Sequence, residues 1–207
     1  MEVPDAEDLI SLVLRKKPKT FCKHTRNGHF NNIGKEYLLV TKDKNAQILC
    51  LDSGESLYDL NLKKREMSTS LAFKSLLFVG TYVDTMFVFS AWSNFEEQFK
   101  FRTRESIICM AVVSEKHNLI AIGCANGVVD FVKVDFSGIK ECSLSLIKGV
   151  RSSDTGYINQ IVMSPYADEL VLACERGIFI VDLDIEDGVL QSCSMSKESY
   201  LRGSLIS

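Results

Sequence analysis

Hydrophobic residues occur along this chain in short runs that are separated by turn-forming residues. Three such runs, at residues 158–163, 170–174 and 178–183, are followed by Ser-Pro, Arg-Gly and Glu-Asp-Gly. Each run is too short for a helix, and apolar runs of this length between turn residues are typical of strands. Residues 156–188 therefore predict a three-stranded antiparallel meander.

The same unit recurs upstream, at intervals of about 40 to 50 residues. Aligning the chain with itself places four small residues at one shared position: Thr41, Gly80, Gly123 and Ala173. The longest interval contains an insertion rich in turn residues at 149–156. A period of this length made only of short strands indicates propeller blades of four strands. A small residue at the shared position lets neighbouring sheets approach closely.

We therefore expect an all-β fold of four-stranded antiparallel blades. The blades are predicted at about 34–66, 67–104, 105–150 and 156–196, and residues 199–207 resemble the start of a further blade. Residues 1–33 form an N-terminal segment. Its acidic residues, apolar run and Pro18 favour a short helix within 1–18, although a strand fits the same residues, and an isolated strand is expected near 20–23.

Composition agrees with a folded domain that has a sizeable core. Apolar residues make up 46% of the 207 residues and charged residues 25%. No apolar run approaches the roughly 20 residues of a membrane span, and we expect no leader because no basic-then-apolar pattern occurs at Met1. The seven cysteines are scattered without close-spaced pairs, which predicts reduced thiols. We expect an intracellular protein, cytoplasmic or nuclear.

The residues of the fourth predicted blade resemble the WD-repeat β-propellers. Residues 161–165 are similar to the first strand and Ser-Pro turn of that family, Leu172-Ala173 to its second strand, and Val181-Asp182 to its signature dipeptide. Leu51-Asp52 and Val134-Asp135 match the same dipeptide. The chain departs from the family where Leu51, Val134 and Val181 replace tryptophan, where the second blade has Ala91-Trp92 without an aspartate, and where Gly28-His29 is the single Gly-His pair. The resemblance, which covers about residues 34–195, implies a divergent WD-repeat-like propeller.

The number of blades implies an incomplete ring. Propellers have typically four to eight blades, and members of the resembled family close most often with seven. An open fan would leave edge strands and an apolar sheet face at its ends. Three arrangements are compatible with this count: a longer chain, blades supplied by another subunit, or closure by a remote segment such as 19–23. We expect one of the first two, and we expect the isolated chain not to be a closed, monodisperse monomer.

Two groups of residues resemble metal ligands without completing a site. Cys22, His24 and His29 offer thiolate and imidazole, but a structural zinc site needs four ligands. The acidic run Asp182, Asp184, Glu186 and Asp187 resembles a calcium loop, but its twelfth position is Cys193, which cannot supply the bidentate carboxylate. We therefore expect no metal and no cofactor.

Catalytic signatures are also missing from the sequence. The chain has no Gly-x-Ser-x-Gly elbow, no phosphate-binding glycine loop and no His-Glu-x-x-His motif. His117 lies in a predicted hairpin turn and is most simply a solvated residue. These observations favour a protein that is not an enzyme.

Basic residues cluster in the predicted connections between blades, although the formal net charge is −3. If every blade follows the same path, one face should carry ten of them: Lys42, Lys44, Lys63, Lys64, Arg65, Arg102, Arg104, Lys148, Arg151 and Arg176. We expect a protein–protein interaction scaffold that is a subunit of a larger complex, whose partners complete the propeller. The alternative is that the basic face binds an acidic or phosphorylated ligand or a nucleic acid.

Overall fold

The protein, seen in a computed structural model, consists of short antiparallel strands. The structure describes residues 30–33, 37–42, 45–50, 53–90, 95–137, 142–164, 168–186 and 189–197. Within these residues, sixteen strands form four separate four-stranded antiparallel sheets, each in simple up-and-down order. The predicted fold class, an all-β protein built from propeller-like blades, is confirmed.

The strands follow the sequence in four consecutive groups. The first sheet contains β1 (Phe30–Ile33), β2 (Tyr37–Lys42), β3 (Asn45–Cys50) and β4 (Ser56–Leu60). The second contains β5 (Met67–Phe73), β6 (Leu76–Thr81), β7 (Thr85–Ser90) and β8 (Glu96–Arg102). The third contains β9 (Ile107–Ser114), β10 (Leu119–Cys124), β11 (Val128–Phe136) and β12 (Cys142–Arg151). The fourth contains β13 (Ile158–Met163), β14 (Glu169–Cys174), β15 (Gly177–Glu186) and β16 (Val189–Lys197).

One strand differs from the expected organisation. β1 completes the first sheet by pairing Phe30 with Val40 and Ile33 with Tyr37, whereas the sequence analysis left residues 1–33 outside the blades. The two central asparagines of its Phe-Asn-Asn-Ile sequence obscure the apolar signal of a strand. The predicted helix in 1–18, the strand near 20–23 and the blade start at 199–207 lie outside the described residues.

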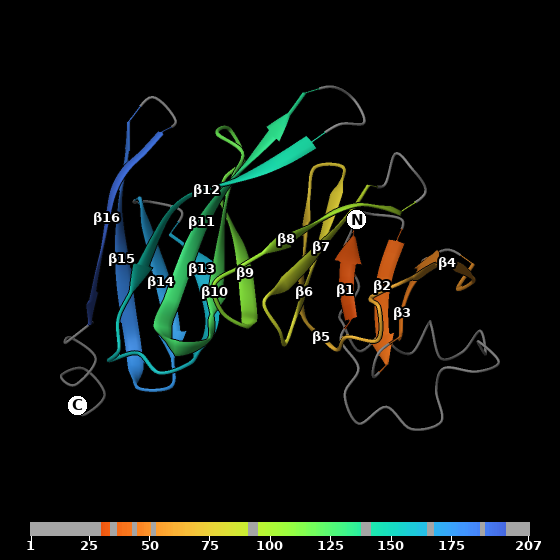
Figure 1. Ribbon diagram of the computed structural model, residues 1–207, viewed down its shortest axis with the longest axis horizontal. Helices are drawn as coiled ribbons and strands as arrows, with labels where there is room; N and C mark the ends of the chain where they lie inside the picture. Colours follow the sequence, from red (N-terminus) through yellow and green to blue (C-terminus); the bar gives the residue numbers. More distant parts are fainter. Residues whose placement is uncertain are drawn as a thin grey trace, which may run out of the picture.

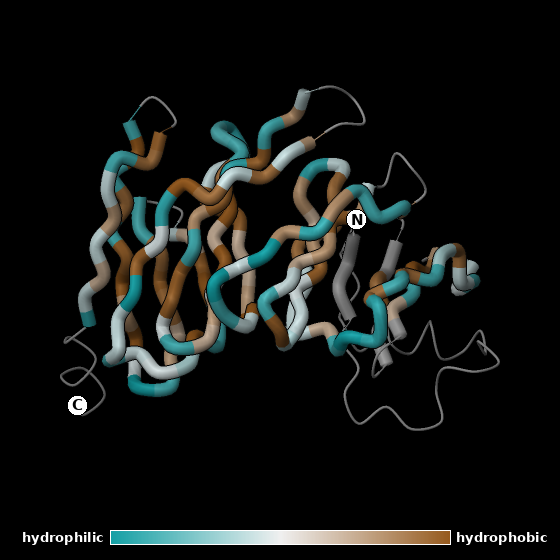
Figure 2. Tube along the Cα trace, viewed as in Figure 1, coloured by the Kyte–Doolittle hydropathy of each residue, from teal (hydrophilic) through white to brown (hydrophobic). Residues whose placement is uncertain are grey.

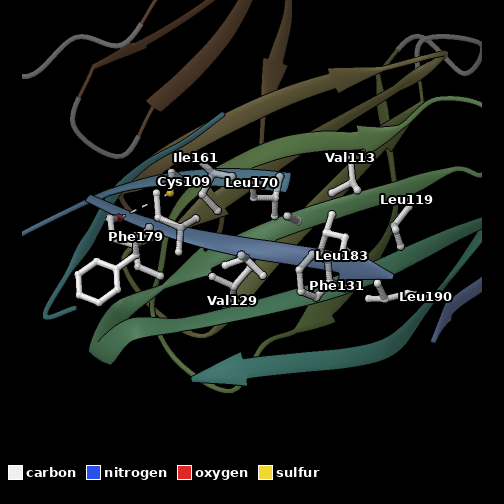
Figure 3. Close-up of a cluster of buried hydrophobic side chains, with 14 residues drawn as sticks. Cys109, Val113, Leu119, Val129, Phe131, Ile161, Leu170, Phe179, Leu183 and Leu190 are labelled. Atoms are coloured by element: carbon white, nitrogen blue, oxygen red, sulfur yellow. Dashed lines mark hydrogen bonds between the residues drawn. The ribbon is translucent and has the colours of Figure 1, made fainter. Parts of the chain in front are cut away.

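The four sheets stack face to face in the order of the chain (Figure 1). A separate apolar cluster fills each gap between neighbouring sheets: around Phe87 between the first and second, around Phe78 between the second and third, and around Phe131 between the third and fourth. Figure 2 shows the hydrophobic colouring concentrated in the strands of the inner sheets. The last cluster is drawn in Figure 3, where Phe131 and Leu183 face one another across the gap. Burial of these clusters provides the main stabilisation of the stack.

Small residues at the shared position allow the close contact between sheets. A Cβ atom on Gly80 would lie 2.7 Å from Ile107 Cγ2, and one on Gly123 would lie 2.9 Å from Ile161 Cδ1. Both isoleucines belong to the first strand of the following sheet. At each of these junctions the first strand of one sheet therefore packs directly over the glycine of the sheet before it.

The stack does not close into a ring. The first and fourth sheets lie at opposite ends of the molecule (Figure 1). Every residue of β6, β7 and β10 is buried, because both faces of these strands are covered. In β14 and β15 buried residues alternate with more exposed ones, because one face of the fourth sheet packs on the third sheet and the other is open.

Candidate functional site

Connections between strands gather along one edge of the stack, which we call the connection face. It consists of the segments that join successive sheets, 61–66, 103–106 and 152–157, and of the turns 82–84, 125–127 and 175–176, along the lower side of Figure 1. Backbone hydrogen bonds join these segments: Thr103 N–H donates to Asp84 O at 3.0 Å, Ala125 to Ser106 at 2.8 Å and Ser152 to Gly127 at 3.1 Å. The connections thus emerge on one face.

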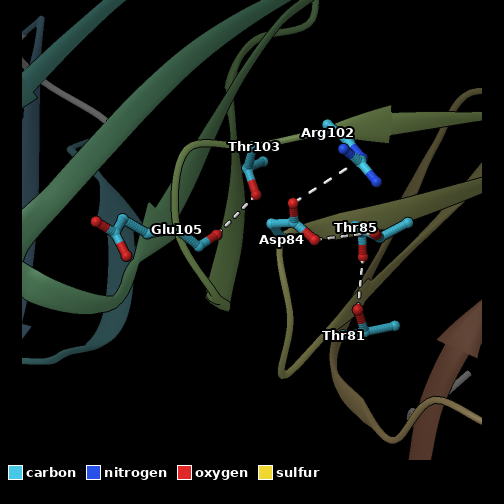
Figure 4. A network of polar contacts seen from close by, with 6 residues as sticks. All are labelled: Thr81, Asp84, Thr85, Arg102, Thr103 and Glu105. Atoms are coloured by element: carbon cyan, nitrogen blue, oxygen red, sulfur yellow. Dashed lines mark hydrogen bonds and ion pairs between the residues drawn. The ribbon is translucent and has the colours of Figure 1, made fainter.

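Side-chain hydrogen bonds fix the part of this face between the second and third sheets (Figure 4). Thr81 Oγ1 donates to the carbonyl of Thr85 at 2.7 Å, and Thr103 Oγ1 donates to the carbonyl of Glu105 at 2.7 Å. Arg102 forms an ion pair with Asp84 at 4.0 Å. Because the polar groups bond within the turns, the connections present a defined surface.

Seven of the ten predicted basic residues lie on the connection face or at its edge. Lys63, Lys64, Arg65, Arg104 and Arg176 belong to its segments, and Arg102 and Arg151 are the last residues of the adjoining strands β8 and β12. Lys148 lies within β12, and its Nζ donates to the carbonyl of Gln191 in β16 at 2.7 Å, so it links the third and fourth sheets. Lys42 is the last residue of β2, but its side chain and the whole of Lys44 lie outside the described residues.

Two of these arginines contact residues at equivalent positions in the second and third sheets. The Arg65 guanidinium lies 5.7 Å from the centre of the Phe87 ring, and Arg104 Nε lies 3.6 Å from Asp130 Oδ1. Phe87 and Asp130 occupy the same register position in β7 and β11, one opposite Val79 and the other opposite Ile122. Each arginine extends from the connection before its sheet, so these two cations bind the protein's own strands.

Acidic residues alternate with the remaining basic ones. Arg102, whose side chain is 81% exposed, pairs with Asp84, and Lys63 lies 4.0 Å from Glu97. Glu66, Glu105 and Glu175 also belong to the connections. Exposed pairs of this kind are each worth under about 1 kcal/mol, so they contribute little to stability. The connection face carries mixed charge, with Lys64 and Arg151 among its exposed cations.

The buried carboxylate of Asp130 is the most unusual polar group in the described residues. Its side chain is fully buried in β11, where burial raises its pKa and the Arg104 guanidinium opposes that rise. A Cβ atom on the neighbouring Gly149 would lie only 2.6 Å from Asp130 Oδ1. Glycine at this position therefore makes room for the carboxylate beside its arginine.

We expect Arg104→Ala to destabilise the protein by about 1 to 3 kcal/mol at pH 7, because it removes the cation beside a buried carboxylate. The destabilisation caused by Arg104→Ala should become smaller as the pH falls. The pKa of Asp130 is higher in the folded protein than in the unfolded chain. Its contribution to stability is therefore fully present below the pKa of the unfolded chain, and it is lost as the pH rises through the pKa of the folded protein. Urea denaturation between about pH 4 and 7 measures this dependence.

Arg102→Ala is the matched control, because Arg102 pairs with the half-exposed Asp84 and should cost less than about 1 kcal/mol at every pH. Asp130→Asn should remove the pH dependence of the Arg104→Ala effect. Equal losses for both arginine variants at pH 7 would contradict the assigned role of Arg104.

The described cysteines are buried or half-buried. Cys109, Cys124, Cys142, Cys174 and Cys193 are free thiols, Cys50 is half-buried, and Cys22 lies outside the described residues. Burial raises the pKa of Cys109 and of Cys124 to about 12, so both stay protonated at neutral pH. Cys109 Sγ lies 3.5 Å from the carbonyl of Ile158 in the last junction.

No metal-binding group is found among the described residues, in the sense of three or more clustered His, Cys, Asp or Glu side chains. Cys22, His24, His29 and Asp187 lie outside them. No helix in the described part of the chain is long and apolar enough to cross a membrane.

A second surface lies at the open end of the stack, where the sequence predicted an apolar sheet face but did not identify its residues. The uncovered side of the fourth sheet, which we call the outer face, carries five apolar residues that are at least partly exposed: Val162, Val171, Ala173, Ile178 and Ile180. Val162 is 51% exposed. On the third sheet the corresponding side is buried, with Phe131 at the position of Ile180 and Gly123 at that of Ala173.

Acidic residues lie beside the apolar ones on the outer face. Asp182 and Asp184 follow Ile180 along β15 and accept hydrogen bonds from Ser194 at 3.4 Å and from Ser192 at 3.2 Å. Glu169 of β14 lies directly opposite Asp182. The sequence contained a signal for this arrangement: β6 and β10 are almost entirely apolar, whereas β14 begins with a glutamate and β15 alternates apolar residues with aspartates.

Comparison with known proteins gives no family assignment. No protein-family model matches the chain, and no curated protein sequence matches it.

Proposed function

We propose that this protein is a non-catalytic scaffold that binds other proteins within a multi-subunit assembly. The observation that carries the proposal is the outer face, where apolar side chains equivalent to buried ones in the third sheet lie open at the end of the stack. Contiguous apolar surface rimmed by polar residues marks sites where proteins interact. A partner protein that packs on this open sheet face would extend the stack.

We also propose that the chain is a divergent relative of the WD-repeat propellers. In support, the register of the strands places Val134-Asp135 of β11 at the same position as Leu183-Asp184 of β15. In both pairs the apolar residue is buried and the aspartate is exposed. The sequence alignment placed Val181-Asp182 at that position, whereas the register pairs these two residues with Leu170 and Glu169, two residues earlier along β15.

The scaffold proposal is tested by sedimentation of the tagged 207-residue chain from extracts of its own cells, at about 0.1 and 0.5 M salt. We expect it to migrate well above its own mass of 23.2 kDa at both concentrations, because an apolar interface is insensitive to salt. Migration as a single chain at both would falsify the scaffold proposal.

The same measurement examines the alternative function, binding of an acidic or phosphorylated ligand or a nucleic acid by the connection face. Its specific support is the group of exposed cations Lys64, Arg102 and Arg151 on one edge of the stack. An assembly that dissociates at the higher salt, and that is lost when these three residues are changed together to glutamate, would establish this alternative instead. Arg65 and Arg104 are left unchanged in that variant because they contact the protein's own sheets.

A further inference from the structure

We propose that the outer face binds one specific kind of partner: a β-sheet of another protein chain, which stacks on the fourth sheet as a further blade. The proposal rests on the scaffold function proposed above and names its surface and the chemistry of its occupant. Three observations define that occupant: the repeated geometry of the junctions, the side chain at the shared small position, and the charge of the outer face.

The junctions within the molecule provide the geometry. At the second junction Ile107 of β9 packs over Gly80, and at the third Ile158 and Ile161 of β13 pack over Gly123. In both, the first strand of the added sheet crosses the first two strands of the sheet beneath it. The outer face offers the same surface, with Ala173 at the glycine position and Val162 and Val171 beside it.

The shared position determines which side chain the partner can place there. Ala173 carries the Cβ atom that Gly80 and Gly123 lack. The isoleucine atoms over those glycines lie 2.7 and 2.9 Å from the place a Cβ would occupy, which is too close for a real contact. A partner strand must therefore carry a smaller apolar residue than isoleucine over Ala173, or cross it at a slightly greater distance.

The charge of the outer face determines which charged side chains the partner should carry. Glu169, Asp182 and Asp184 occupy the positions that Leu119, Lys133 and Asp135 hold on the third sheet. Lys133 and Asp135 pair with one another at 3.7 Å, whereas the outer face places three carboxylates together. Covering them without a counter-charge would be unfavourable. The complementary surface combines apolar side chains opposite Val171 and Ile180 with lysine or arginine opposite Asp182 and Asp184.

A second copy of this chain does not fit the same surface. Two outer faces packed in parallel would bring the carboxylates of Asp182 and Asp184 against one another. Packed in opposite directions, they would bury those carboxylates against the apolar residues Val171 and Ile180 of the other copy. On the outer side of the first sheet the two described aliphatic residues, Val40 and Leu49, are buried and offer no equivalent surface.

The test is site-specific photo-crosslinking of the full 207-residue chain in its own cells. Ile180 is replaced by the photoreactive residue p-benzoylphenylalanine, and the crosslinked peptide is identified by mass spectrometry. We expect a single main adduct with another protein, at an apolar strand segment of about five residues that is flanked by lysine or arginine. The charge-reversal pair Asp182→Lys with Asp184→Lys should reduce the adduct at least about tenfold, which corresponds to about 1.4 kcal/mol.

Leu57 is the matched control position, because it is also exposed and apolar but lies in the first sheet, and it should not yield this adduct. Circular dichroism confirms that each labelled chain remains folded. An adduct with a second copy of the chain, with a helical segment, or equally from Leu57 would overturn the proposal, as would the absence of any adduct. If the chain still sediments as part of an assembly in those cases, the scaffold proposal stands and only the occupant is wrong.

Discussion

Replacing Phe131 by alanine should destabilise the protein by about 3 to 5 kcal/mol, the largest loss we expect from a single core substitution. Phe131 is fully buried and lies in the apolar cluster between the third and fourth sheets (Figure 3). Its removal leaves a cavity that two strands held in rigid sheets cannot fill. The free energy of unfolding is measured by urea denaturation, from the midpoint at an unchanged m value.

Ile180→Ala is the control for this substitution, because Ile180 occupies the position of Phe131 in the next sheet but faces outward. We expect a loss of about 1 kcal/mol there, since the side chain is only partly buried before the change. Similar losses for both variants would show that the outer face is covered in the isolated chain.

Gly123→Val should destabilise the protein by about 2 to 3 kcal/mol, because the junction has no room for a side chain. A Cβ atom at this position would lie 2.6 Å from Cys109 Sγ and 2.9 Å from Ile161 Cδ1. The added methyl groups would press the third and fourth sheets apart. The change is measured by thermal and urea denaturation of the isolated chain.

Ala173→Val introduces the same side chain at the equivalent position of the outer face, which no further sheet covers among the described residues. We expect its effect on the isolated chain to stay within about 0.5 kcal/mol. A destabilisation as large as that of Gly123→Val would mean that other residues of the chain already cover Ala173.

The repeat could be predicted from the sequence because each blade carries its own local signal. The apolar runs around Leu77, Ile120 and Leu172 are bounded by turn residues, and strands were expected and are found at all three. The small residue in each run identified the position where adjacent sheets meet. Gly80 and Gly123 lie at such contacts because the same packing problem recurs at each junction.

Features that depend on a partner in another element of the chain could not be predicted in this way. β1 consists of Phe-Asn-Asn-Ile, and only its pairing with β2 makes it a strand. The sequence does not show that Arg65 lies over Phe87 or that Arg104 pairs with Asp130. These contacts join residues from different elements, so they follow from the tertiary structure.

The residues of the outer face could not be identified from the sequence for a related reason. Its residues alternate with buried ones along β14 and β15, and such alternation predicts only that one side of a sheet is exposed. Whether the exposed side is a binding surface depends on the comparison with β10 and β11, where the same positions are buried. That comparison requires the register of the strands.

The serial arrangement of the sheets also determines which part of the molecule unfolds first. Each sheet packs on its immediate neighbours along the chain, as in other repeat proteins, so its resistance to local opening depends on how many neighbours it has. The third sheet is held from both sides, whereas the fourth sheet, among the described residues, is held from one side, through the cluster around Phe131 and Leu183 and the Lys148–Gln191 hydrogen bond. The fourth sheet can therefore detach without disturbing the second, and the surface offered to a partner is also the least protected unit of the chain. Occupation of that surface would make the fourth sheet an inner one and raise the cost of opening it.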